Sequence, residues 1–212
     1  MNLGIAIISI TALGYISNWL NWRFLNYKLV QWLYYLGTLV HETSHALLCL
    51  LTGAKIREFS VFSSEPHVTH LEPKLPLIGK PLISLAPILG GLSFLYVMNH
   101  YLLANYFTIP QFSGFHTILP EITKFLVQIN LLQWQSWVML LVFMNLGAML
   151  GPSPSDLKNI WPFLLLFFFF TIPFGTNLIS LAILLILTNI LLQIALILSI
   201  KILKGIKRLV HI

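Results

Sequence analysis

The stretch Leu36-Gly-Thr-Leu-Val-His-Glu-Thr-Ser-His-Ala-Leu-Leu-Cys-Leu-Leu51 decides the fold, because it sets three ionisable side chains inside an otherwise apolar helix. Its centre is His41-Glu42-Thr43-Ser44-His45. Two histidines four residues apart lie on one helix face, one turn apart, so both imidazoles can reach one metal ion. The glutamate between them then lies beside that ion, where a water would be activated. The motif predicts a zinc hydrolase. The alternative is a pair of packed, hydrogen-bonded histidines beside a glutamate that faces a cavity.

The composition indicates a polytopic membrane protein. Of 212 residues, 58% are hydrophobic and 8% are charged, whereas a soluble domain carries about 25% charged residues. Ionisable groups at membrane depth are costly and by default mark functional sites. The net charge of +6 fits basic loops and anionic lipid head groups better than nucleic acid. We therefore expect the chain to contact the lipid bilayer and no nucleic acid.

Six apolar segments have about the length needed to cross a bilayer. They lie near residues 3–20, 29–52, 82–105, 132–151, 160–176 and 177–203. The last two form one apolar stretch, which the turn residues at 173–177 divide. Residues 54–72 hold two short segments of alternating polarity, which is typical of a β-hairpin. The sequence thus predicts an all-α polytopic membrane protein that forms one domain over residues 1–212, with a small β-hairpin between the second and third spans.

The basic residues predict the orientation in a cell membrane. Nine of the 12 Lys and Arg residues lie in the 53–81 loop, the 152–159 segment and the C-terminal tail. Because cytoplasmic loops carry an excess of such residues, this side is predicted to be cytoplasmic, with both termini and the histidine pair toward it. No Lys or Arg precedes the first apolar segment, so we interpret it as a retained helix rather than a signal peptide.

A catalytic zinc normally has three protein ligands and one open position for water. Asp156 is the only aspartate of the chain, and it lies at the end of the fourth apolar segment, on the predicted side of the histidine pair. Pro152 and Pro154 break the helix there, and irregular backbone at membrane depth is tolerated where it lines a cavity. The prediction is one Zn²⁺ held by His41, His45 and Asp156. The alternative for Asp156 is a helix N-cap.

The order of these motifs carries a resemblance. The His-Glu-x-x-His helix is followed by the hairpin, by a span that opens with Ile83-Ser-Leu-Ala-Pro-Ile-Leu-Gly90, and by an Asn…Pro-x-Pro-x-Asp segment. This arrangement resembles the site-2 protease family of intramembrane zinc metalloproteases, in its compact six-span type. The residues flanking Asp156 differ from the Leu and Gly of the family pattern. The resemblance implies a zinc metalloprotease that cuts a transmembrane protein substrate in regulated intramembrane proteolysis. Glu42 would be the general base on a zinc-bound water, and the hairpin would help to hold the substrate.

Two further pairs of polar residues have open roles. Asn145 and Asn159 are candidates for contacting substrate, with an interhelical hydrogen bond as the alternative for each. His67 and His70 have the spacing of a regulatory metal site, and the alternative is a pair of solvated loop histidines.

Two other functions compete with proteolysis. The first is a non-proteolytic pseudoprotease that binds transmembrane helices, against which the intact His41, Glu42, His45 and Asp156 argue. The second is a zinc or proton transporter. Transport needs polar groups strung across the membrane, whereas these groups cluster toward one side.

Overall fold

The computed structural model describes residues 3–25, 30, 32–63, 66–108, 117–169 and 176–210. The described part of the chain is mostly helical (75%), with eight α-helices and a small two-stranded antiparallel sheet, as the sequence predicts. The elements are α1 (Leu3–Phe24), α3 (Tyr35–Leu51), β1 (Ile56–Ser60), β2 (His67–His70), α4 (Pro76–Ser84), α5 (Ala86–Val97), the π-helical turn η1 (Met98–Leu102), α6 (Ile118–Val127), α7 (Trp134–Met149), α8 (Pro154–Phe169) and α9 (Thr176–Val210).

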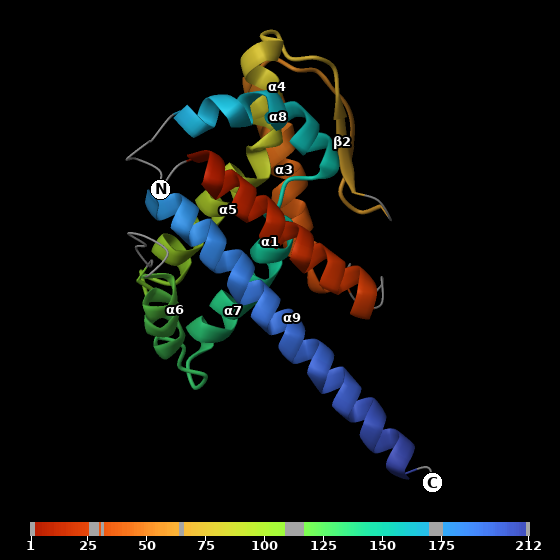
Figure 1. Cartoon of the computed structure of the whole chain (residues 1–212), viewed down its shortest axis with the longest axis vertical. Helices are drawn as coiled ribbons and strands as arrows, with labels where there is room; N and C mark the ends of the chain where they lie inside the picture. Colours follow the sequence, from red (N-terminus) through yellow and green to blue (C-terminus); the bar gives the residue numbers. More distant parts are fainter. Residues whose placement is uncertain are drawn as a thin grey trace.

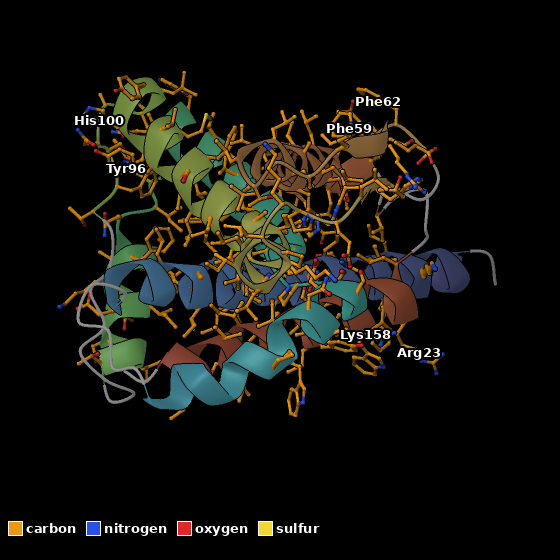
Figure 2. All side chains as sticks on the ribbon, turned by 90° about the horizontal axis from the view of Figure 1, so that it is seen from above. Arg23, Phe59, Phe62, Tyr96, His100 and Lys158 are labelled. Carbon is orange, nitrogen blue, oxygen red and sulfur yellow. The ribbon has the colours of Figure 1, made fainter. Side chains whose placement is uncertain are left out.

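The helices form a bundle around α7 and α9 (Figure 1). Helix α9 packs against α7 and α1, and α3 packs against α5 and α7. Helices α1 and α9 lie side by side and run in the same direction (Figure 1). Their hydrogen bonds agree with this direction, because Ser17 pairs with Asn189 and Asn21 pairs with Gln193, four residues further along both helices. Helix α8 packs beside α4 and α1 at one end of the bundle and runs close to antiparallel to α1 (Figures 1 and 2).

Only part of the predicted span layout is found. In the part of the chain that the structure describes, one helical segment, Leu181–Gly205, is long and apolar enough to cross a membrane. A second qualifies if α4, α5 and η1 count together, although they are bent by 52°. The predicted 82–105 span is therefore a broken helix that already begins at Pro76. The break at Leu85 lies just before Pro87, which has no N–H for a continuous helix. The six-span layout remains a prediction, and most of the turn predicted at 173–177 lies outside the described residues.

The predicted hairpin is present. Strand β1 pairs antiparallel with β2, with Ile56 opposite His70 and Ser60 opposite His67. The ring of Phe62, just after β1, lies 5.7 Å from the ring of Tyr35, the first residue of α3. The hairpin therefore runs back along α3 from the end of this helix toward its beginning (Figure 1). Figure 2 shows Phe59 and Phe62 at the outer edge of the molecule, and both side chains are exposed.

Helices α3 and α7 touch through their backbones at Gly37. A methyl group added to Gly37 would lie 2.8 Å from the carbonyl carbon of Asn145 and 3.0 Å from the Cγ of Met149. Such a close approach requires glycine, because any side chain would separate the helices. It brings the C-terminal end of α7 to the face of α3 that carries His41.

Candidate metal centre

Helix α3 carries the three motif side chains in a largely buried place. Glu42 is 8% exposed and His45 is 9% exposed. The Nε2 atoms of His41 and His45 lie 3.3 Å apart, as expected for residues one helical turn apart. The two imidazoles therefore present the same nitrogen to one point.

The other ring nitrogen of each histidine is tied to a backbone carbonyl. The Nδ1–H of His41 donates to the carbonyl of Met149 at 2.6 Å, and that of His45 donates to the carbonyl of Ile83 at 2.9 Å. A carbonyl only accepts, so Nδ1 carries the proton and the neutral ring has its lone pair on Nε2. Two lone pairs that face each other cannot form a hydrogen bond. A cation that both can ligate is the group that fits between them.

Neither carbonyl is paired with the N–H that would bond it in a continuous helix. In a helix, the carbonyl of Ile83 would accept from the N–H of residue 87, but Pro87 has none. The carbonyl of Met149 lies at the end of α7, three residues before Pro152. The N–H of Ser153 would bond this carbonyl in a continuous helix, but it donates to Asp156 Oδ2 instead, at 2.9 Å. Each histidine thus supplies the donor that its carbonyl lacks.

Asp156 completes the group. Its Oδ2 lies 3.7 Å from the Nε2 of His45, and its side chain is buried. It is the third residue of α8, and the Ser153 hydroxyl accepts the N–H of Asp156 while Asp156 accepts the N–H of Ser153. This is a capping box. The N-cap of α8 is therefore Ser153. Asp156 accepts the N–H of Ser153 in return, and the same carboxylate faces the histidines.

One ligand atom from each of His41, His45 and Asp156 lies within 4.8 Å of the other two. Throughout the described ranges, no other group of three or more His, Cys, Asp or Glu side chains is placed to hold a metal ion. Two imidazole nitrogens and one carboxylate oxygen are the donor set of a catalytic zinc site that keeps a fourth position open. The three residues therefore fit the predicted ion.

Glu42 lies beside this group rather than in it. It is not one of the three residues whose ligand atoms converge. Strand β2 packs against α3, the helix that carries Glu42 and the two histidines. The role of Glu42 as general base stays a prediction.

Asn145 is buried between α7 and α3. Its Oδ1 accepts the N–H of Gly37 at 3.1 Å, and its Nδ2 donates to the carbonyl of Leu141 at 2.9 Å. Gly37 lies in the first turn of α3, where an N–H has no partner within the helix. Asn145 thus makes the interhelical bond that the sequence offers as its alternative role, and contact with substrate stays a prediction.

Asn159 lies one turn after Asp156 and is exposed. Its Nδ2 donates to the hydroxyl of Ser84 at 3.2 Å. Because Ser84 follows Ile83, this bond links the helix of Asp156 to the carbonyl that orients His45. Contact of Asn159 with substrate remains a prediction.

His67 and His70 of the hairpin have other surroundings. The Nε2 of His67 lies 3.4 Å from Glu58 Oε2, and the Nδ1 of His70 donates to the carbonyl of Leu71 at 2.8 Å. Neither belongs to a group of three or more metal-ligating side chains in the described part of the chain. A regulatory metal site there stays a prediction.

The carbonyls of Ile83 and Met149 are functional groups that sequence reasoning misses. Any residue can supply a carbonyl, so residue type gives no signal. The available signal is a proline four residues after Ile83 and another three residues after Met149.

Comparison with known proteins agrees with the motifs. A family model described as Peptidase M50B-like matches residues 13–103, which include His41, Glu42 and His45. This match supports the site-2 protease family that the motifs predict. Neither the curated proteins nor the solved structures compared with the chain gave a match.

Proposed function

We propose that this protein is a membrane-embedded zinc metallopeptidase of the site-2 protease type, which hydrolyses peptide bonds of transmembrane substrates. One observation carries the proposal. Three ligand atoms of His41, His45 and Asp156 converge within 4.8 Å, and backbone carbonyls orient both imidazoles toward the same point.

The chemistry follows from the residues around that point. A zinc ion held there would lower the pKa of a water toward about 7 and polarise the scissile carbonyl. Glu42, beside His41, would accept a proton from the attacking water and pass it to the leaving amine. The bonds to Met149 and Ile83 keep both imidazoles in the orientation that ligation needs.

The position of the hairpin supports a transmembrane substrate. A helical segment hides its peptide bonds in hydrogen bonds, so it must unwind before attack. Strand addition to the edge of the hairpin would hold the unwound segment extended. Strand β2 packs against α3, the helix of the two histidines, which supports a place for that segment beside the metal centre.

The proposed location is a cell membrane, with the metal centre toward the cytoplasm. The excess of Lys and Arg in the 53–81 loop, close to the end of α3, supports this orientation. The apolar helix Leu181–Gly205 supports membrane insertion.

The experiment uses the whole chain purified in detergent, with measurement of bound zinc and of cleavage of a model transmembrane peptide. We expect Glu42→Gln to keep zinc and lose cleavage, whereas Glu121→Gln on α6, a control carboxylate remote in sequence, changes neither. We expect His41→Ala and Asp156→Ala to lose zinc.

Three outcomes contradict the proposal. Normal cleavage by Glu42→Gln removes the proposed base, and full zinc content in Asp156→Ala removes the third ligand. A wild-type chain that binds zinc and the peptide without cutting it is a pseudoprotease instead.

A further inference from the structure

A second buried polar cluster lies outside the metal centre, between α1, α9 and the residue before α3. It consists of Ser17, Asn21, Tyr34, Asn189 and Gln193. Each of these residues is 3% exposed or less. Tyr34 precedes His41 by seven residues, which is about 10 Å along a helix. The cluster therefore needs an explanation that the metal centre does not supply.

Hydrogen bonds link all five side chains. The amide nitrogen of Asn189 donates to Ser17 Oγ at 2.8 Å. The amide nitrogen of Gln193 lies 3.0 Å from Ser17 Oγ, 2.9 Å from Asn21 Oδ1 and 3.3 Å from Tyr34 Oη. The amide oxygens of Asn189 and Gln193 are buried and have no hydrogen-bond partner among the described residues. Buried polar atoms are nearly always paired, so two such oxygens in one cluster point to a missing partner.

Turning the amides does not remove the need for that partner. Oxygen and nitrogen exchange places when an amide is turned. An N–H₂ group would then occupy each open position, and it would lack an acceptor there just as the oxygen lacks a donor. In either orientation, one amide atom of Asn189 and one of Gln193 need a hydrogen-bond partner from outside the cluster.

The chemistry of the cluster favours water over a metal cation. A cation needs several free oxygen ligands and usually a carboxylate, but no Asp or Glu belongs to the cluster. The oxygens of Ser17, Asn21 and Tyr34 already face amide nitrogen. Water can donate to each open amide oxygen, which a second amide nitrogen of the cluster does not do. Buried waters typically make about three such bonds to groups that would otherwise lack partners.

We infer that this cluster is a binding site for ordered water within the apolar bundle, which bridges α1 and α9 to the start of α3. The site is independent of the proposed peptidase activity. Its function is to fix the N-terminal end of the helix that carries the metal ligands through water-mediated bonds.

Hydroxyl-radical labelling read by mass spectrometry tests the inference, because radicals formed from bound water modify adjacent side chains. The whole purified chain is used. After correction for intrinsic reactivity, we expect Tyr34 to be labelled several-fold more than the equally buried Leu185, which belongs to the apolar core. The exposed neighbour Tyr35 is the positive control. Labelling of Tyr34 no higher than that of Leu185 overturns the inference.

A variant pair assigns the water to the cluster. Gln193→Leu should lower the labelling of Tyr34 and leave that of Tyr35 unchanged, whereas Gln133→Leu at the exposed start of α7 should change neither. Unchanged labelling of Tyr34 in folded Gln193→Leu contradicts the assignment. If this variant does not fold, the wild-type labelling alone decides.

Melting in sodium, potassium and choline chloride at equal ionic strength separates water from a cation. Equal melting temperatures are expected, and a shift specific to sodium or potassium overturns the assignment to water.

Discussion

At the residue scale, the candidate centre depends on hydrogen bonds that fix the tautomers of its histidines. His41 and His45 donate to carbonyls of α7 and α4, elements far from them in sequence. These bonds leave Nε2 of each ring as the ligand atom. The carbonyl of Ile83 is available because Pro87 has no N–H to donate to it. Pro87 thus helps to orient the ring of His45 although it is not itself a metal ligand.

Pro87→Ala tests this role. Alanine restores an N–H that can occupy the Ile83 carbonyl and compete with His45. Since loss of an outer-shell partner typically costs 10–100-fold in metal affinity, we expect zinc binding to weaken by about that factor. Competition with a chelator measures the affinity directly, without relying on cleavage.

Pro81→Ala is the matched control for Pro87→Ala. It also restores an N–H within the same bent helix pair, but the corresponding carbonyl belongs to Leu77 rather than to a residue that binds a histidine. We expect its zinc affinity to equal that of the wild type. If Pro87→Ala binds zinc as tightly as Pro81→Ala, the absence of an N–H at Pro87 does not orient His45.

At the element scale, the centre needs α3, α4, α7 and the start of α8 to meet. Helix α3 brings His41, Glu42 and His45, and the close approach at Gly37 brings α7 against it. The capping box of Ser153 and Asp156 begins α8 directly after α7, so the third ligand arrives at the same place. The bond from Asn159 to Ser84 joins α8 to α4.

Gly37→Ala should destabilise the chain, because its methyl group would overlap the backbone of α7. Overpacking of this kind typically costs about 1–3 kcal/mol. We expect a lower melting temperature in detergent and weaker zinc binding, since the shift would move Met149 away from His41.

Gly205→Ala on α9 is the control, because an added methyl group there has nothing within 4 Å. It should not lower the melting temperature. A Gly37→Ala chain as stable as this control would argue against close backbone contact between α3 and α7.

At the scale of the whole molecule, the direction of the helices bears on the topology. Helices α1 and α9 are parallel. Successive spans alternate in direction, so parallel first and last spans require an odd number of crossings. If α1 and α9 both cross the membrane, their parallel packing predicts termini on opposite sides, whereas the distribution of basic residues predicts both termini on one side.

Tags on the two ends of the chain test the topology in sealed vesicles. From the parallel packing, we expect an impermeant probe to reach the two tags from opposite sides of the membrane. Access to both tags from the same side would favour the orientation predicted from the Lys and Arg residues. It would mean that α1 or α9 does not cross the membrane.

The sequence predicts features whose signals are local. The helical fold, the hairpin and the His41-Glu42-x-x-His45 face follow from polarity and spacing over a few residues. Asp156 follows from the scarcity of acidic residues. The break at Leu85 also has a local cause in Pro87, but the continuous apolarity of residues 82–105 hides it. Asn189 and Gln193 show a polar spacing in α9, yet nothing local indicates that Ser17 and Asn21 pair with them.

The sequence by itself determined which side chains can bind a metal, because two imidazoles one turn apart on an apolar helix, with a carboxylate between them, have few other uses. Only the tertiary structure decided how they are oriented. The carbonyls of Ile83 and Met149, the capping bond at Ser153 and the contact at Gly37 come from segments distant in the chain. Hydrogen bonds to backbone depend on where helices end and cross, and residue type alone does not encode that arrangement.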